Sequence, residues 1–197
     1  MDKNDVLQSM IEQNNGYLIT SQAVAAGITK PYLSKYVIDH HMEKAAHGIY
    51  NEEDVWPDEL FIMQMRSKAV VFCGETALFL HGMTDREYSK ICVSVPAKYN
   101  ASHFKNTNVE VRYVQDKIYN LGVCEVKSSS GNFVRAYDKE RCICDLIRDR
   151  KKYEVQLFQT AMKEYMTNKD KRISLLIEYA EKLSIRDEVM KYVEVLV

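Results

Sequence analysis

The sequence predicts an α+β protein with two unequal domains. Three observations lead to this class. Short segments with helical or strand-like patterns, separated by glycines, fill the first fifty or so residues. Strand-like apolar runs then cluster between residues 70 and 137, and three amphipathic helical patterns occupy residues 153–195. Strands that come first and helices that come last are typical of a mixed α+β domain with a helical C-terminal end.

The first element is a helix that covers residues 6–11. Its apolar residues follow the i, i+3, i+4 spacing of one helical face, and Asn14, Asn15 and Gly16 end it. Residues 16–19 then form a short strand candidate. The chain therefore begins with a helix followed by a strand.

A second, shorter helix is expected over residues 22–26. Thr20 or Ser21 can accept hydrogen bonds from its first amides, and Gly27 provides the positive φ that often ends a helix. This helix is followed directly by a tight turn.

The third helix is expected from Pro31 to about His40. Thr29 is its predicted N-cap, and a proline is tolerated in the first helical turn. Residues 42–46 and 49–50 then form two short strands around His47 and Gly48, where glycine permits a tight hairpin turn. The order of helix, strand, short helix, turn, helix and hairpin predicts a winged helix-turn-helix.

A polar, acidic stretch at residues 51–54 is the best candidate for a linker. We therefore expect a winged helix-turn-helix domain over residues 1–52 and an α+β domain over residues 57–197. Pro57 opens a helix that has Asp58 and Glu59 in its first turn, where carboxylates favour the positive end of the helix dipole.

The larger domain continues with alternating strand and helix signals. The apolar run at residues 70–73 predicts a strand. Residues 91–95 alternate in polarity up to Pro96, and residues 109–113 alternate between apolar and charged side chains, which is typical of a half-buried strand. Asp138 is a predicted helix cap. The expected strands are residues 70–73, 91–95, 109–113, 123–126 and 133–137, and the expected helices are residues 75–82, 138–150, 153–166, 171–183 and 186–195.

The composition is that of an ordinary folded protein. Of its 197 residues 46% are hydrophobic and 28% charged, and the formal net charge is -1. No apolar run approaches the ~20 residues of a membrane helix, and the polar N-terminus does not match a secretory signal. We expect a cytoplasmic protein that does not contact membranes.

The five cysteines lie among apolar residues, and no second Cys pair accompanies Cys142 and Cys144. This pattern favours buried thiols over a zinc site. We expect no metal and no cofactor.

The helix-turn-helix is the strongest functional signal in the sequence. Its third helix would enter the major groove of DNA, while helix N-termini and the hairpin contact the backbone. The candidate DNA-binding residues of this domain are Ser21, Thr29, Lys30, Tyr32, Ser34, Lys35, Lys44 and His47.

The charge of the N-terminal segment argues against DNA binding by this domain alone. Residues 1–56 contain four more acidic than basic residues, whereas affinity for DNA comes largely from Lys and Arg. The densest basic stretch lies elsewhere and consists of Arg148, Arg150, Lys151 and Lys152. We expect it to extend the DNA contact, although basic residues at a helix end also offset the helix dipole.

The residues do not favour an enzyme. No phosphate-binding glycine loop, nucleophile elbow or metal-ligand cluster is present in the sequence. Arg141 and Asp145, four residues apart on one helix, are expected to form a surface ion pair. His81 is expected to contact carbonyls in the last turn of its own helix.

Several blocks of sequence resemble the AbiEi family of antitoxins. In the first domain they are residues 16–20, 28–34 and 48–50, and in the second residues 57–60, 75–86 and 134–145. Together, in this order, they span nearly the whole chain.

The resemblance implies a transcriptional autorepressor that binds inverted repeats in its own promoter. It also implies an antitoxin of a phage-defence (abortive-infection) pair, which counters a nucleotidyltransferase-like toxin without a stable complex (type IV). The alternative is a winged-helix interaction module whose C-terminal domain binds a protein partner directly.

Overall fold

The computed structural model describes the backbone of residues 2–196 and the side chains of residues 2–194. The chain is a mixed α+β protein with two sheets and a helical C-terminal end, as the sequence predicts. It forms two compact units: Met1–Lys68 with Lys127–Phe133, and Ala69–Val126 with Val134–Val197. The outer ends of the expected domains, residues 1 and 197, lie outside the described residues.

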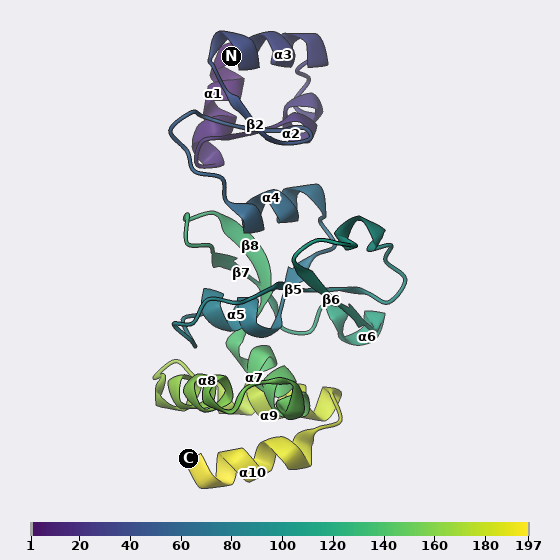
Figure 1. Ribbon diagram of the computed structural model, residues 1–197, viewed down its shortest axis with the longest axis vertical. Coiled ribbons are helices and arrows are strands. Elements are labelled where there is room, and N and C mark those ends of the chain that lie inside the picture. The colour runs from purple at the N-terminus through teal and green to yellow at the C-terminus, as the bar shows by residue number, and fades with distance from the viewer. Residues whose placement is uncertain (1, 197) are drawn as a thin grey trace. The chain divides into compact units, whose positions relative to one another are not determined.

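The first unit contains four helices and a small sheet (Figure 1). The sheet is antiparallel and has the strand order β1-β3-β2. The elements are α1 (Lys3–Gln13), β1 (Tyr17–Ile19), α2 (Thr20–Ala25), α3 (Lys30–Asp39), β2 (Glu43–Ala46), β3 (Ile49–Asn51) and α4 (Glu59–Arg66).

The three N-terminal helices pack around one apolar cluster. Leu7 and Ile11 from α1 lie in it with Leu33 and Tyr36 from α3, and each of the four is at most 4% exposed. These positions follow the helical spacing by which the sequence predicts the helices. Burial of this cluster holds α3 against α1 and leaves the opposite side of α3 exposed.

The start of α2 differs from the prediction. The helix begins at Thr20, immediately after β1, and no side chain caps its first turn. The amide of Thr20 instead donates to the carbonyl of Gly48 in the β2–β3 turn, at 2.8 Å. The tertiary contact therefore replaces the cap that Thr20 or Ser21 was expected to supply.

The first unit extends beyond the expected boundary at residues 52–57. It includes α4 because Tyr17 of β1 packs against Phe61, with ring centroids 5.0 Å apart, and its hydroxyl accepts a hydrogen bond from the amide of Asp58 at 2.7 Å. Asp58, the N-cap of α4, in turn binds the loop of Lys127–Phe133. Its carboxylate accepts hydrogen bonds from Ser128 Oγ at 2.5 Å and Asn132 Nδ2 at 2.9 Å. No pattern in the sequence connects this loop to Asp58.

The second unit is built on a five-stranded mixed sheet with the order β6-β5-β4-β8-β7. β5 pairs antiparallel with β4 and parallel with β6, and β4 pairs parallel with β8. The strands are β4 (Val71–Phe72), β5 (Ile91–Pro96), β6 (Val109–Val114), β7 (Val123–Lys127) and β8 (Phe133–Tyr137).

β5 is buried on both faces, although its sequence was read as alternating. Residues 91–95 are all buried, including the polar Ser94. The reason is that α5 (Gly74–Leu80) and α6 (Asp116–Tyr119) both pack against β5, whereas the alternation reflects side-chain polarity alone. The edge strand β6 is half-buried, in agreement with its alternating pattern.

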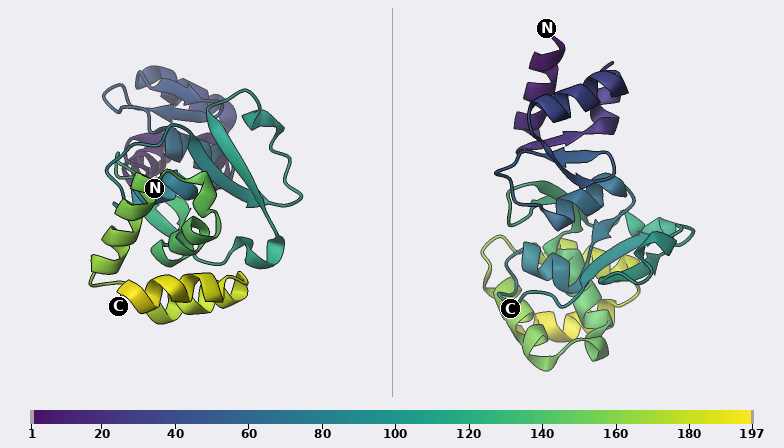
Figure 2. Two further views of the ribbon diagram at one scale, coloured as in Figure 1. Left: turned by 60° about the horizontal axis from the view of Figure 1, so that its bottom comes forward. Right: turned by 45° about the horizontal axis from the view of Figure 1, so that its top comes forward.

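Helices surround this sheet and form the C-terminal end (Figures 1 and 2). α5 contacts β5, while α7 contacts α8, α9 and α10. Figure 2 shows α9 and α10 side by side. The bounds are α5 (Gly74–Leu80), η1 (Ser102–Phe104), α6 (Asp116–Tyr119), α7 (Lys139–Arg148), η2 (Arg150–Lys152), α8 (Val155–Thr167), α9 (Ile173–Lys182) and α10 (Arg186–Leu196).

α7 begins where the sequence predicts it. Asp138 is its N-cap, and Asp138 Oδ1 accepts a hydrogen bond from the amide of Arg141 at 2.9 Å. The short elements η1, α6 and η2 were not predicted, because four residues or fewer carry no periodic signal. Among the described residues, no helix is long and apolar enough to cross a membrane.

Candidate nucleic-acid interface

A groove of about 430 Å³ lies in the first unit between the start of α2, the start of α3 and the β2–β3 turn. We call it the α2–hairpin groove. Its polar and charged lining residues are Thr20, Ser21, Lys30, His47 and Arg66. Three of the predicted DNA-binding residues, Ser21, Lys30 and His47, are therefore brought to one place.

The α2–hairpin groove contains no carboxylate among its lining residues. Lys30, His47 and Arg66 are exposed, so Lys30 and Arg66 give the groove a positive charge. This is notable because the first unit, taken over residues 2–68 and 127–133, has ten acidic and seven basic residues.

Three of these acidic residues gather elsewhere on the unit. Glu43, Glu53 and Asp54 line a second, smaller hollow of about 280 Å³ next to Trp56. The acidic bias of the N-terminal segment is therefore not spread evenly. Because opposite charges lie on different surfaces, a net acidic domain can still present a basic surface to a phosphate.

The other predicted residues of this domain are exposed but do not line the groove. Thr29 precedes α3, Ser34 and Lys35 lie on its outward side, and Lys44 lies on β2. Because α3 is packed by Leu33 and Tyr36, Ser34 and Lys35 point away from the core. They extend the exposed surface along α3.

Tyr32 is not free, contrary to the expectation. Its side chain is half-buried and packs against the apolar cluster. Its hydroxyl donates to Asn4 Oδ1 of α1 at 2.8 Å, and Lys3 Nζ lies 5.3 Å from the ring centroid. The position next to Leu33 places Tyr32 at the edge of the buried face, where it joins α3 to α1.

The basic stretch at residues 148–152, in the second unit, is largely engaged in contacts within the protein. Arg148 forms ion pairs with Asp145 and Asp149, both at 2.9 Å, and Lys152 pairs with Asp149 at 3.0 Å. Burial acts to raise the pKa of Asp149, but the hydrogen bonds from Arg148 and Lys152 outweigh it and lower that pKa.

The other two members of the stretch differ from each other. Arg150 lies over the ring of Phe158, with Cζ 4.2 Å from the ring centroid, and donates to the carbonyl of Tyr153. Lys151 is exposed. The sequence shows four neighbouring cations, whereas the structure gives three of them internal partners.

The ion pair between Arg141 and Asp145 is buried, and the expectation of a surface pair was wrong. The side chains are 1% and 8% exposed. Arg141 Nη1 also donates to the carbonyls of Ile118 and Leu121, at 2.9 and 3.0 Å. The i, i+4 spacing was correct, but spacing does not reveal what covers a helix.

His81 also differs from its expected role. Its Nε2 lies 2.7 Å from the carbonyl of Tyr137 at the end of β8, not near a carbonyl of its own helix. Burial lowers the pKa of His81 below its usual value of 6.5. His81 is therefore a tertiary contact between α5 and β8.

The thiols are buried or half-buried and weakly acidic. Burial raises the pKa of Cys73 and of Cys144 to about 12, and that of Cys124 to about 11. Within residues 2–196, no group of three or more His, Cys, Asp or Glu side chains could hold a metal ion.

The sequence did not identify Arg66 as a candidate DNA-binding residue. It is the last residue of α4, a helix whose apolar residues identify it only as part of a core. A basic residue in a last turn is a weak signal, because it is usually explained by the helix dipole. Only the fold brings it to the same groove as Lys30 and His47.

Comparison with known proteins gives a fold and no family. No protein-family model matches this chain, and no curated protein sequence matches it. Among solved structures, the chain is similar to the crystal structure of the Rv2827c protein from Mycobacterium tuberculosis, with a TM-score of 0.53 and 10% sequence identity. The match covers 89% of this chain and 70% of that chain, and at this identity it supports the fold alone.

Proposed function

We propose that this protein is a DNA-binding transcriptional autorepressor and antitoxin of the AbiEi type, with a winged helix-turn-helix at its N-terminus. The observation that carries the proposal is the α2–hairpin groove, in which Ser21, Lys30 and His47 meet without a carboxylate. Ser21 lies on α2, Lys30 on α3 and His47 in the β2–β3 turn, and in a winged helix-turn-helix these are the elements that approach DNA.

The order of elements in the first unit supports the same proposal. α1, β1, α2, α3 and the β2–β3 hairpin follow one another as expected for a winged helix-turn-helix. The turn between α2 and α3 spans only residues 26–29, and α3 has an exposed side that bears Ser34 and Lys35. α3 would enter the major groove, and His47 and Lys44 would contact the phosphate backbone.

The small number of cations sets an expectation for the affinity. Lys30, Lys35, Lys44 and Arg66 can each neutralise one phosphate, so the logarithm of the affinity should fall with log[salt] with a slope of about -4 per bound copy at most. Such a slope is modest and implies a weak affinity for each copy. Inverted repeats would raise the affinity for the whole operator, because two copies bind one operator.

The experiment is a fluorescence anisotropy titration of the full chain with the DNA upstream of its own gene, at two salt concentrations. Lys30→Glu should weaken binding by about tenfold or more and lower the salt slope by about 1. Lys163→Glu, an equally exposed charge reversal on α8, is the matched control and should bind as the wild type does. If the affinity and salt slope of Lys30→Glu equal those of the control, α3 does not hold DNA and the proposal fails.

The antitoxin half of the proposal rests on the resemblance of the second domain to the AbiEi family. It is tested by co-expression with the adjacent nucleotidyltransferase-like protein: growth should be rescued although the two proteins do not co-purify. If no such gene lies next to this one, or growth is not rescued, this half of the proposal fails.

A protein-interaction module is the second candidate, favoured by exposed apolar side chains. In the first unit, Ile38 on α3 is 72% exposed and Trp56 is 87% exposed. Large apolar residues in such positions are common in protein interfaces. Stable co-purification with the toxin, lost in Trp56→Ser, together with no sequence-specific DNA binding, would favour this function over the autorepressor.

A further inference from the structure

A cavity of about 590 Å³ lies wholly within the second unit. We call it the basic cavity. Its walls come from β5, from the end of β6 with α6, from α7 with η2, and from the end of α9. These segments are far apart in the sequence, so no motif reveals the cavity.

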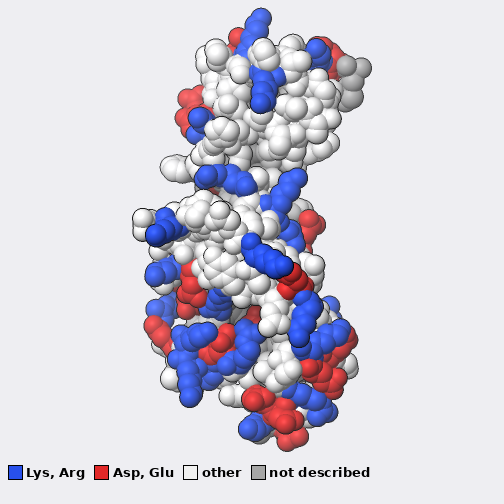
Figure 3. Space-filling view, turned by 90° about the vertical axis from the view of Figure 1, so that its right-hand side faces the viewer, with Lys and Arg blue, Asp and Glu red and all other residues white. Residues whose placement is uncertain are grey.

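The lining of the basic cavity has a strong excess of positive charge. Six Lys or Arg side chains and two Asp side chains line it, an excess of four positive charges in a protein whose formal net charge is -1. Figure 3 shows that Lys and Arg side chains gather over the second unit, whereas the visible face of the first unit has few. The cations are Arg112, Lys117, Arg141, Arg148, Lys152 and Lys182.

Three of these cations pair with the two carboxylates that line the cavity. Asp145 pairs with the buried Arg141 and with Arg148, while Asp149 pairs with Arg148 and Lys152. Both carboxylates that line the cavity thus pair with cations of α7 and η2, on one side of the cavity. They are not available to offset the cations on the other side.

The cations on the other side have no carboxylate in the lining. Lys117 makes no ion pair with any described residue. Lys182 pairs only with Glu178 on its own helix, through side chains that are each 52% exposed. Such an exposed pair contributes little and is easily exchanged for a stronger anion. Lys117 and Lys182 are therefore the cations that a ligand would meet.

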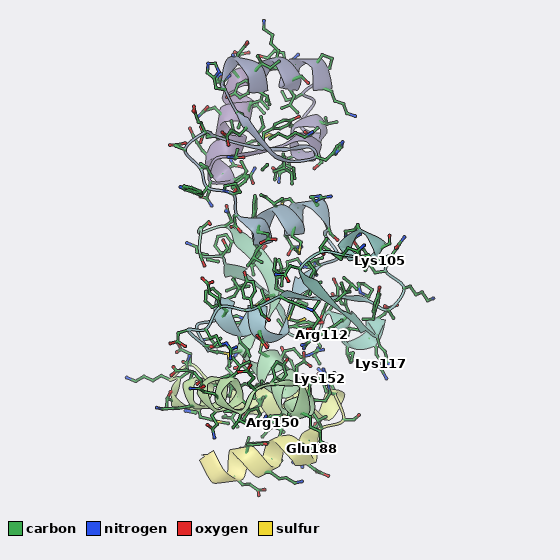
Figure 4. All side chains as sticks on the ribbon, in the orientation of Figure 1. Lys105, Arg112, Lys117, Arg150, Lys152 and Glu188 are labelled. Atoms are coloured by element: carbon green, nitrogen blue, oxygen red, sulfur yellow. The ribbon has the colours of Figure 1, made fainter. Side chains whose placement is uncertain are left out.

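Arg112 is held in a fixed orientation at the wall of the cavity. Its Nη1 donates to the hydroxyl of Tyr153 at 2.9 Å, and its Nε pairs with Glu110 at 2.8 Å. Figure 4 shows Arg112, Lys117 and Lys152 in the same part of the second unit. A guanidinium already fixed by its neighbours loses little entropy when it binds an oxyanion.

Cations gathered in a concavity repel one another, and the low-dielectric walls strengthen their field. A bound polyanion relieves this repulsion. Glu110, which pairs with Arg112, lowers the excess from four to three. One phosphate group carries at most two negative charges, fewer than this excess. The charge of the cavity therefore matches a ligand with more than one phosphate.

We propose that the basic cavity binds a small ligand that carries two or more phosphate groups, such as a nucleoside polyphosphate or an inorganic polyphosphate. This site is independent of the proposed DNA interface, which lies in the other unit.

The shape of the cavity favours a small molecule over a nucleic-acid duplex. Its volume lies within the range of about 300–1,000 Å³ that is usual for small-molecule sites. The cations surround a hollow, whereas a duplex would be followed by a basic stripe along an open surface. Tyr113, which is 58% exposed, and Leu183 also line the cavity and provide apolar surface next to the charges.

The test is isothermal titration calorimetry of the full chain with three probes: ATP, inorganic pyrophosphate and a short DNA duplex of unrelated sequence. We expect ATP and pyrophosphate to bind with one site per chain and to raise the unfolding temperature. Tighter binding of ATP than of pyrophosphate would show that the nucleoside is also recognised, and equal binding that only the phosphates are.

The variants are Lys117→Glu and Lys182→Glu, with Lys105→Glu as the matched control. All three lysines are exposed, but Lys105 follows η1 and does not line the cavity. Each cavity variant should bind ATP and pyrophosphate about tenfold more weakly, while the control binds as the wild type does. Unchanged thermal unfolding of each ligand-free variant would show that its fold is intact.

Two results would overturn the proposal. The first is no binding of ATP or pyrophosphate at millimolar concentration, or equal binding by Lys117→Glu, Lys182→Glu and the control. The second is that the unrelated DNA duplex binds, that these two substitutions abolish this binding, and that neither ATP nor pyrophosphate binds. This result would make the cavity part of a DNA surface. In contrast, unchanged operator binding in Lys30→Glu would overturn only the DNA-binding proposal and would leave the phosphate site unaffected, so the two proposals fail separately.

Discussion

The carboxylate of Asp145 lies against the guanidinium of Arg141, with both carboxylate oxygens 3.2 Å from Arg141 Nε. The two side chains are almost completely buried. Arg141 also binds the carbonyls of residue 118 in α6 and of residue 121 just after it. This pair therefore connects α7 to a segment that carries one wall of the basic cavity.

Asp145→Asn should destabilise the protein by about 3 kcal/mol, because it leaves the buried charge of Arg141 uncompensated. The matched control is Glu178→Gln, which breaks an exposed pair with the same i, i+4 spacing and should cost less than about 0.5 kcal/mol. Urea unfolding followed by circular dichroism measures both. Equal losses in the two variants would mean that the Arg141–Asp145 pair is not buried as described.

Gly122→Ala should destabilise the second unit by about 2–4 kcal/mol. The residue has a φ of +78°, and a Cβ there would lie 2.7 Å from Arg141 Cβ and 3.0 Å from Asp138 Oδ1. Both the left-handed backbone and the crowding cost free energy.

Gly82→Ala separates these two causes in the same unfolding assay. Gly82 has a φ of +65°, and a Cβ there would have no neighbour within 4 Å. Gly82→Ala should therefore lower the free energy of unfolding only by the cost of the left-handed backbone, about 1–2 kcal/mol. If Gly122→Ala costs no more than Gly82→Ala, the crowding around Gly122 is not real.

Acidification should destabilise the protein partly through His81. Because burial lowers the pKa of His81 in the folded state, the unfolded state binds the proton more readily. Its contribution to stability is complete above pH 6.5 and is lost as the pH falls below that value, by at most about 1.4 kcal/mol per pH unit.

The measurement is the urea midpoint at pH 7.5 and at pH 5.5. His81→Gln keeps a donor for the carbonyl of Tyr137 but does not titrate, so its midpoint should change less with pH than that of the wild type. His103→Gln, an exposed histidine, should behave as the wild type does. The same pH dependence in all three proteins would contradict this role of His81.

The thiols should resist alkylation in the folded protein. Cys73, Cys142 and Cys144 are buried, and burial raises their pKa well above that of a free thiol. At pH 8, iodoacetamide followed by mass spectrometry should modify these three only after unfolding in urea. Cys124, which is half-buried, should react first. Rapid modification of Cys73 without denaturant would show that the sheet opens readily.

The sequence determined the local structure of this protein. The helix positions, the cap at Asp138 and the turn around Gly48 all follow from periodicity, from side chains that satisfy free amides, and from glycines with positive φ. These signals lie within a few residues of one another, so a reader of the sequence can combine them. The mixed α+β class with its helical C-terminal end followed from the order of these elements.

The tertiary structure decided which side chains share a surface. Ser21, Lys30 and His47 were identified one by one in the sequence, but Arg66 joined them only through the packing of α4. The basic stretch at residues 148–152 appeared free in the sequence, yet Asp145 and Asp149 neutralise part of it.

The basic cavity and the burial of Arg141 have the same physical origin. Both depend on contacts between elements distant in the sequence, such as α6, α7 and α9. Charge along the chain is a local property, whereas burial and the field inside a cavity depend on everything packed around a group. For this reason the sequence could identify the charged residues but not which of them remain without a partner.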